Sequence, residues 1–199
     1  MVFSSHIFIF YFLALILGAY YFSPRRLKHL VLTLGSYLFY AWWNPWFVLL
    51  MIASTIIDFL CGKIIFNSTP EKVQRKIGLL ISIAANLSIL GFFKYGNFFA
   101  ENVSILARSI GLGEIVLPEF FNKIILPIGI SFYTFQSMSY TIDIYRKKAL
   151  PAENFLTFAC YVSMFPQLVA GPIVRYSDIA KQLKNRIHSA GSFIYGFTR

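Results

Sequence analysis

Polar side chains inside long apolar stretches are the residues of this sequence that could do chemistry. Gln136 and Asp143 lie seven residues apart, which is two turns of a helix, so their side chains share one face. Arg146 follows three residues later and can reach Asp143 on that face. The face either lines a polar path or pairs with a neighbouring helix, and both alternatives stay open.

The segment 165–175 combines an apolar composition with two prolines and two flanking hydrogen-bonding groups, Gln167 and Arg175. Proline removes a backbone donor and clashes with the preceding turn, so a continuous helix is not expected here. Broken backbone at membrane depth is tolerated only where protein buries it or where it lines a wet cavity. The candidates for lining a tunnel are therefore Gln136, Asp143, Arg146, Gln167, Pro172 and Arg175.

Asp58 is a further intramembrane polar residue, well inside the apolar run 47–65. A charged side chain at the centre of a bilayer costs roughly 2.5–3.5 kcal/mol on insertion scales. We therefore expect Asp58 to face a polar partner or water. It acts either as a structural hydrogen-bond or ion-pair anchor or as a functional group.

Covalent and metal chemistry have no support in the sequence. There is no Gly-x-Ser-x-Gly element, and neither Cys61 nor Cys160 has a histidine nearby in sequence. The three histidines show no ligand spacing, and the cysteines form no CxxC pair. We predict no metal site and no bound cofactor.

The composition is typical of an integral membrane protein. Of 199 residues, 57% are hydrophobic and 13% are charged, whereas a soluble domain carries about 25% charged residues. Mean hydropathy is +0.64. The net charge of +10 falls in short clusters between apolar runs, a pattern of loops beside anionic lipid. The predicted partner is the lipid bilayer and not nucleic acid.

Five apolar runs are candidates for spanning helices: residues 2–22, 30–43, 47–65, 77–93 and 124–144. Residues 104–110 read as an amphipathic surface helix that the glycines near 111–113 end. Basic connectors follow the first, third and fifth runs and alternate with neutral ones, which places the N-terminus outside the cytoplasm.

A sixth apolar run, 155–174, breaks this alternation, because a full crossing would put the basic segment 181–186 outside. Its helix breakers favour a segment that enters the membrane and returns. The predicted fold class is all-α, a polytopic membrane protein with about five spanning helices plus a broken, re-entrant segment. Residues 191–199 read as the start of another apolar segment, so we expect residues 1–199 to be the N-terminal part of a longer multi-pass domain.

Two long motifs resemble the membrane-bound O-acyltransferase family. The first is LPIGISFYTFQ at 126–136, followed by YTIDIYR at 140–146, and the second is FPQLVAGPIVRY at 165–176. The opening MVFSS and the stretch SYLFYAWW at 36–43 are similar to the bacterial branch of alginate O-acetylation and teichoic-acid D-alanylation. The likeness covers essentially the whole chain.

The resemblance implies an enzyme of the bacterial cytoplasmic membrane that transfers an acyl group, for this branch acetyl, to hydroxyls of an exported polysaccharide or envelope polymer. It implies an acyl donor such as acyl-CoA or another acyl carrier as co-substrate, and acyl-carrying or periplasmic partner proteins. The family's essential histidine lies on a later membrane segment within a tunnel, and histidine suits the base of such a reaction. His6, His29 and His188 do not match that context, so we expect the catalytic histidine beyond Arg199 and no activity from this portion alone.

Two other classes of function remain as alternatives. A transporter also uses broken helices at membrane depth, although the apolar runs show no clear inverted repeat. A non-catalytic membrane scaffold would lack the histidine altogether. A histidine inside an apolar segment beyond Arg199 would favour the enzyme, and a stop codon soon after Arg199 would favour the scaffold.

Overall fold

The computed structural model describes residues 5–69, 72–111, 125–168, 171, 174–184 and 189–198. Every regular element in these ranges is a helix, which confirms the all-α prediction. The first helix begins with a π-helical stretch, η1 (Ile7–Leu13), and continues as α1 (Ala14–Phe22). The elements that follow are α2 (Lys28–Ala41), α3 (Pro45–Asn67), α4 (Val73–Ser109), α5 (Ile130–Tyr145), α6 (Phe155–Ser163), α7 (Phe165–Leu168), α8 (Tyr176–Lys184) and α9 (Ala190–Thr198).

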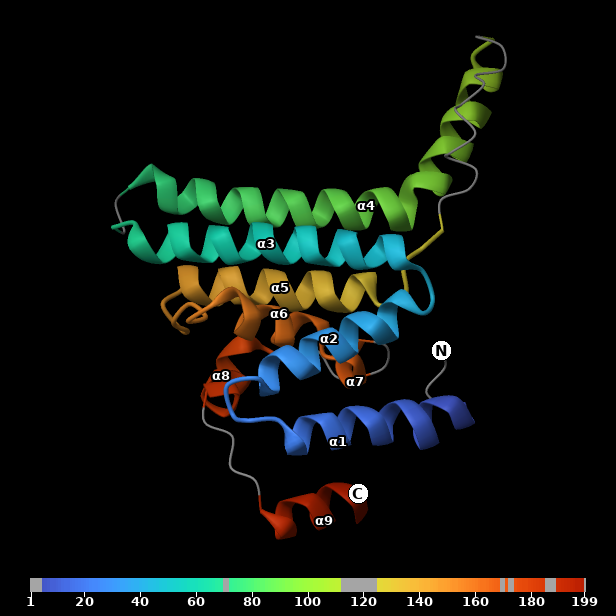
Figure 1. Cartoon of the computed structure of the whole chain (residues 1–199). Coiled ribbons are helices and arrows are strands. Elements are labelled where there is room, and N and C mark those ends of the chain that lie inside the picture. Colours follow the sequence, from blue (N-terminus) through green and yellow to red (C-terminus); the bar gives the residue numbers. More distant parts are fainter. Residues whose placement is uncertain are drawn as a thin grey trace.

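The core is a bundle of three helices, α3, α4 and α5, each of which contacts the other two (Figure 1). Helices α2 and α6 pack on each other and on α3, and α1 packs on α2. Local sequence signals set the starts of two of these helices. Asn44 caps α3 by accepting from the Trp46 N–H at 3.0 Å, with Pro45 in the first turn, and Asn154 caps α6 by accepting from the Thr157 N–H at 2.8 Å.

Two helices in the described part of the chain, α3 and α4, are long and apolar enough to cross a membrane. The helix Ile7–Phe22 is apolar but shorter, and α2 and α5, with 14 and 16 residues, fall below the roughly 20 residues of a typical span. The structure therefore supports a membrane protein. It does not support the predicted count of about five spans.

Helix α4 corrects a second expectation. The predicted fourth span and the predicted surface helix at 104–110 form one continuous helix of 37 residues, which bends so that its far end leaves the bundle (Figure 1). No proline stands in this helix to interrupt its hydrogen bonds, so Lys94 does not close it. Gly111, with φ of 77°, follows the helix end as predicted.

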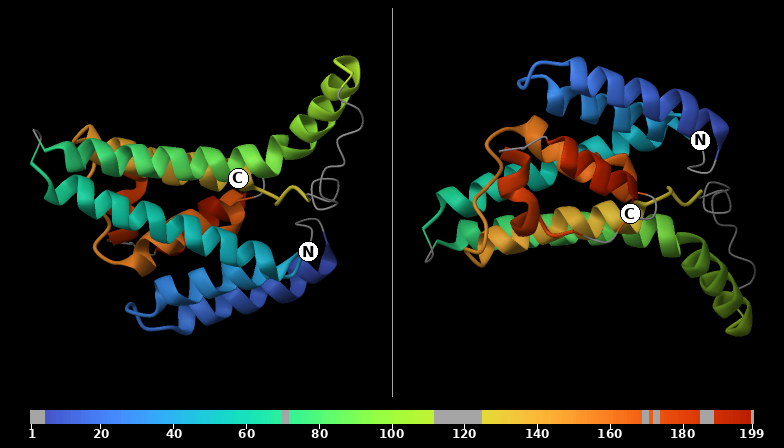
Figure 2. Two further views of the ribbon diagram at one scale, coloured as in Figure 1. Left: turned by 90° about the horizontal axis from the view of Figure 1, so that it is seen from above. Right: turned by 90° about the horizontal axis from the view of Figure 1, so that it is seen from below.

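The connectors sort by charge onto the two ends of the bundle (Figures 1 and 2). The α1–α2, α3–α4 and α5–α6 connectors lie at one end, which we call the basic end; its described basic residues include Arg25, Arg26, Lys72, Arg146, Lys147 and Lys148. The α2–α3 turn lies at the other end and carries Trp42, Trp43 and Trp46. Opposed basic and tryptophan ends are the pattern of helices set across a bilayer.

The broken segment turns back on itself. Helix α6 has nine residues, a length of about 13.5 Å, far less than the roughly 30 Å of a hydrocarbon core. It ends at Ser163 and α7 starts after Met164. Helix α8 then contacts α5 and α6, with the Tyr176 ring 4.9 Å from that of Tyr140. Residues 169, 170, 172 and 173 lie outside the described residues.

Candidate functional site

The two sequence motifs, 126–136 at the start of α5 and 165–176 around α7, are in direct contact. Gly129 precedes α5 in a left-handed conformation with φ of 75°, and a Cβ there would collide with the carbonyl oxygen of Leu168 in α7. Only glycine combines this backbone conformation with so close an approach. The carbonyl of Ile128 also accepts a hydrogen bond from the Tyr40 hydroxyl of α2 at 2.8 Å. We call this meeting of α2, α5, α6 and α7 the junction.

Two predicted site residues, Gln136 and Gln167, meet in the junction. The Gln136 amide donates to the Tyr161 carbonyl at 2.8 Å and to the Gln167 side-chain oxygen at 3.5 Å. Gln136 is buried and Gln167 is half-buried. The Tyr161 hydroxyl in turn donates to the Val174 carbonyl at 2.8 Å. Gln136 and Tyr161 each donate a side-chain hydrogen bond to a backbone carbonyl. These bonds hold the returning segment against α5.

Helix α7 is anchored from the other side by the N-terminal helices. The Ser36 hydroxyl of α2 accepts a hydrogen bond from the Phe165 N–H at 3.2 Å, which satisfies a backbone donor that the break after Ser163 leaves without a helical partner. Four aromatic rings from η1, α2 and α7 form a cluster with centroid separations of 5.5–5.9 Å: Phe8, Phe12, Phe39 and Phe165. Such spacing is typical of favourable ring pairs.

The junction also holds buried hydroxyls that make no hydrogen bond in the described part of the chain. They belong to Thr134 in the second turn of α5 and to Ser163 at the end of α6. Buried polar groups nearly always have a partner, if only an ordered water. These hydroxyls are therefore available to water or to a group from outside the described residues.

The predicted face of Asp143 and Arg146 is not an ion pair. Asp143 is buried, with 5% of its surface exposed, and its Oδ2 atom has no hydrogen-bond partner among the described residues. Arg146 is exposed, and within the described residues no ion pair joins it to Asp143. Helix α5 ends at Tyr145, so Arg146 is its C-cap. Arg175 is likewise exposed, immediately before α8, and Pro172 lies outside the described residues.

Asp58 forms the centre of a separate polar network between α3, α4 and α5. Its carboxylate accepts from the Ser82 hydroxyl at 2.6 Å and from the Asn86 amide at 2.8 and 2.9 Å. Ser137 and Thr141 of α5 extend the network to Asn86 at 3.3 Å and to Ser82 at 2.8 Å. Every member is buried, so the structure supports the anchoring alternative for Asp58.

Sequence reasoning missed the partners of Asp58, although a signal was present. Ser82 and Asn86 stand four residues apart inside an apolar run, as do Ser137 and Thr141. That spacing places each pair on one helix face. No comparable signal marks Tyr161, Ser36 or Tyr40, because their partners are backbone groups distant in sequence.

Neither described histidine belongs to the junction. His6 is exposed and stacks on Phe10, and the His29 ring pairs with the Leu183 carbonyl at 3.1 Å. His188 lies outside the described residues. Among the described side chains, no group of three or more His, Cys, Asp or Glu residues is placed to hold a metal ion.

Comparison with known proteins gives a consistent set of relatives. The chain is 41% identical over its full length to the probable alginate O-acetylase of Pseudomonas syringae pv. tomato, covering 38% of that protein. It is 40% identical over its full length to the corresponding protein of Pseudomonas aeruginosa, covering 38%. The peptidoglycan O-acetyltransferase of Helicobacter pylori is 33% identical over 94% of the chain and 39% of that protein.

The chain thus spans about two fifths of the length of the curated relatives it matches. No protein-family model matches the chain. No solved structure is significantly similar to it.

Proposed function

Because the chain belongs to the alginate O-acetylase-like branch of the membrane-bound O-acyltransferase family, we propose that the protein transfers acetyl groups to hydroxyls of a cell-envelope polymer. The observation that carries this proposal is the 41% identity over the full length of the chain to an O-acetylase. The acceptor is a polysaccharide or peptidoglycan, in line with the names of the relatives. The co-substrate is an acyl donor such as acyl-CoA, and acyl-carrying or periplasmic proteins are proposed partners.

Acyl transfer to an alcohol needs a base for the hydroxyl proton and a group that holds the developing oxyanion. Gln136 and Tyr161 are occupied by backbone carbonyls in the junction, and neither described histidine reaches it. We therefore assign the base, a histidine by family resemblance, to the part of the relatives' length that this chain does not match.

The role proposed for this chain is to shape the path of the acceptor. The junction is held by Gln136 and Tyr161 on one side and by Ser36 on the other, so the break between α6 and α8 has a defined form. Arg175 stands exposed where the returning segment reaches α8. A cation at that place would attract an anionic group of a substrate toward the path.

The proposed setting is the bacterial cytoplasmic membrane with the basic end toward the cytoplasm. Basic connectors are retained on the cytoplasmic side, and the start of η1 lies at the opposite end (Figure 1). The segment α6–α8 then enters from the cytoplasmic side and returns to it. This arrangement follows from the shared position of the basic connectors and of α8.

The test uses the full-length protein in its own host. Deletion of the gene should abolish base-releasable acetate on the envelope polymer, and the wild-type gene should restore it. Polymer acetylation that is unchanged by the deletion would contradict the proposed function.

A paired substitution tests the contribution of this chain. We expect Arg175→Ala to lower polymer acetylation by about tenfold, the effect of losing one charged contact, while the protein remains at wild-type level in the membrane. Lys181→Ala is the matched control, because Lys181 is also basic and exposed but stands on α8 away from the junction. Equal polymer acetylation by both variants would show that Arg175 has no particular role in guiding the substrate.

A further inference from the structure

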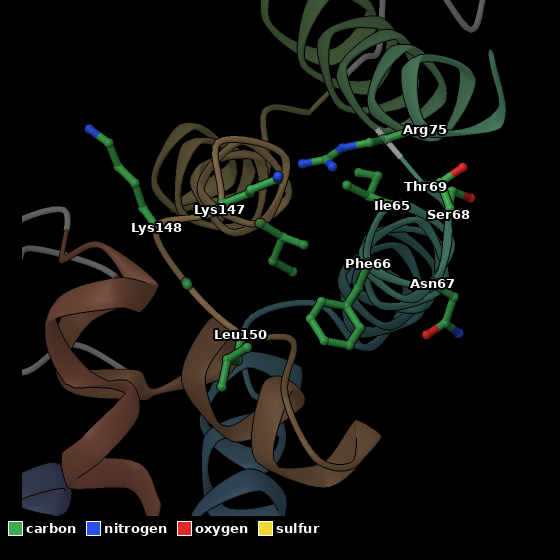
Figure 3. Close-up of a pocket in the computed structure, with 11 residues that line it drawn as sticks. Ile65, Phe66, Asn67, Ser68, Thr69, Arg75, Lys147, Lys148 and Leu150 are labelled. Atoms are coloured by element: carbon green, nitrogen blue, oxygen red, sulfur yellow. The ribbon is translucent and has the colours of Figure 1, made fainter. Parts of the chain in front are cut away.

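A cavity opens at the basic end, away from the junction. It lies between the end of α3, the start of α4 and the connector that follows α5, and has a volume of about 530 Å³ (Figure 3). Its polar lining residues are Asn67, Ser68, Thr69, Arg75, Lys147 and Lys148. No carboxylate is among the described residues that line it.

Arg75 is the buried cation of this cavity, with 8% of its surface exposed. One guanidinium nitrogen donates to the Tyr145 carbonyl, and the guanidinium carbon lies 5.1 Å from the centre of the Tyr145 ring. A guanidinium has five N–H donors, so the bond to Tyr145 fixes its position and leaves further donors for a ligand. The sequence predicted Arg75 only as a connector charge, whereas in the structure it is buried and lines this cavity.

Lys147 brings a second positive charge to the same place. Its backbone has φ of 59°, and its N–H bonds the Ile144 carbonyl at 3.0 Å. Glycine is the usual residue at this left-handed position after a helix. A lysine there keeps a side chain that glycine would lack, and Figure 3 shows it pointing toward Arg75, whereas Lys148 points away.

Two like charges that converge on one cavity repel each other, and an anion between them offsets this repulsion. We propose that this cavity binds the phosphate group of a phosphate ester, held by Arg75 and Lys147. A guanidinium matches two phosphate oxygens at once. Ser68 and Thr69 line the same space, although the Ser68 hydroxyl donates to the Ile64 carbonyl at 2.7 Å. Phe66 and Leu150 offer apolar surface to the rest of the ligand.

The volume is larger than a lone phosphate requires and lies in the range of small-molecule sites, about 300–1,000 Å³. Two kinds of phosphate ester could reach this end of the bundle. One is the headgroup of an anionic phospholipid in the surrounding bilayer, and the other is a soluble phosphorylated compound such as a coenzyme A thioester. The phosphate site itself does not rest on the proposed acetyl transfer.

The experiment measures binding to the purified full-length protein without turnover. In one arm, coenzyme A is titrated onto the protein in neutral detergent. In the other, the protein is placed in phosphatidylcholine nanodiscs with and without phosphatidylglycerol. The readout in both arms is the midpoint of thermal unfolding, which a ligand of the folded state raises.

Lys147→Asn is the decisive variant, because asparagine tolerates the left-handed backbone and removes the charge. We expect it to lower the affinity for the probe that stabilises the wild-type protein by about tenfold, the effect of losing one charge-assisted contact. Lys181→Gln is the matched control, with the same change of charge at an exposed position outside the cavity. Arg75→Lys, which keeps the charge but loses the planar fork, should weaken the same probe.

The arm that responds identifies the source of the phosphate. Stabilisation by phosphatidylglycerol assigns a lipid headgroup, and stabilisation by coenzyme A assigns a soluble ester. The proposal is overturned if neither probe raises the midpoint of the wild-type protein, or if Lys147→Asn and Lys181→Gln lose the effect equally. Acetylation assays of the same variants report separately on the proposed function.

Discussion

At the scale of single residues, the Asp58 carboxylate is held by hydrogen bonds between helices. Asp58 accepts hydrogen bonds from Ser82 and Asn86 of α4, and these reach Thr141 and Ser137 of α5. In an apolar surrounding, a fully partnered network joins helices, whereas a half-partnered one destabilises them. Asp58 therefore sets how three helices pack, and we expect its substitution to act on stability first.

Asp58→Ala should lower the free energy of unfolding of the full-length protein by about 1–3 kcal/mol, the cost of leaving buried partners unsatisfied. Asp58→Asn should cost less, because its amide oxygen can still accept from Ser82. Thermal unfolding in detergent measures both. Leu60→Ala, at an exposed position of the same helix, serves as the control, and a larger loss there would contradict the anchoring role.

Gly129 offers a second test at the residue scale. Gly129→Ala would combine an unfavourable φ with a clash against the Leu168 carbonyl oxygen, and the left-handed backbone alone costs roughly 1–2 kcal/mol. We expect lower thermal stability and lower polymer acetylation. Gly91→Ala is the matched control, since a Cβ there has nothing within 4 Å. If both substitutions behave alike, the contact between α7 and the start of α5 is not important.

At the scale of elements, the short helices α6, α7 and α8 form the segment that we propose to be re-entrant. Asn154 caps the start of α6, and the helix ends before Met164, after nine residues. The returning chain is held by the Tyr161–Val174 hydrogen bond and by the packing of Tyr176 on Tyr140. These contacts keep α8 beside α5, so both ends of the segment lie on the same side of the bundle.

A labelling experiment tests this return. In a cysteine-free background of the full-length protein, cysteines introduced for Lys148 and Lys181, both exposed, should react with an impermeant maleimide from the same face. We expect labelling in inverted membrane vesicles and not in intact cells with a permeable outer membrane. Labelling of the two positions from opposite faces would show that the segment crosses the membrane.

At the scale of the whole molecule, charge and aromatic residues give the bundle two different ends. The basic connectors gather at one end and the tryptophans of the α2–α3 turn at the other (Figures 1 and 2). Lysine and arginine remain on the cytoplasmic side during insertion, whereas tryptophan prefers either interface. We therefore propose that the basic end, which carries the proposed phosphate site, faces the cytoplasm.

The orientation leads to a prediction for the opposite end. A cysteine introduced for Trp43 in the cysteine-free background should be labelled by the impermeant maleimide from outside the cytoplasm, and one introduced for Arg26 from inside. Both side chains are exposed, so access and not burial decides the result. The reverse pattern would invert the proposed topology and place the cavity outside the cytoplasm.

Much of the site could be predicted at the level of segments. The motif at 126–136 and the broken segment at 165–175 were both recognisable, and Gln136 and Gln167 do meet. Helix periodicity allowed Arg146 to reach Asp143, but it does not tell where α5 ends, and within the described residues no ion pair joins the two. The burial of Arg75 was missed, because a connector charge is expected to face water or lipid headgroups.

The sequence by itself indicated the all-helical class, a membrane protein and the family resemblance, because hydrophobic composition, helix breakers and long motifs are local properties of the chain. Tertiary structure decided which polar groups anchor and which remain available. Asp58 and Gln136 looked alike as polar residues in apolar runs, yet one ties α3 to α4 and the other ties α5 to α6. Only the packing of helices distant in sequence supplies those partners, and only the left-handed turn after α5 brings Lys147 toward Arg75.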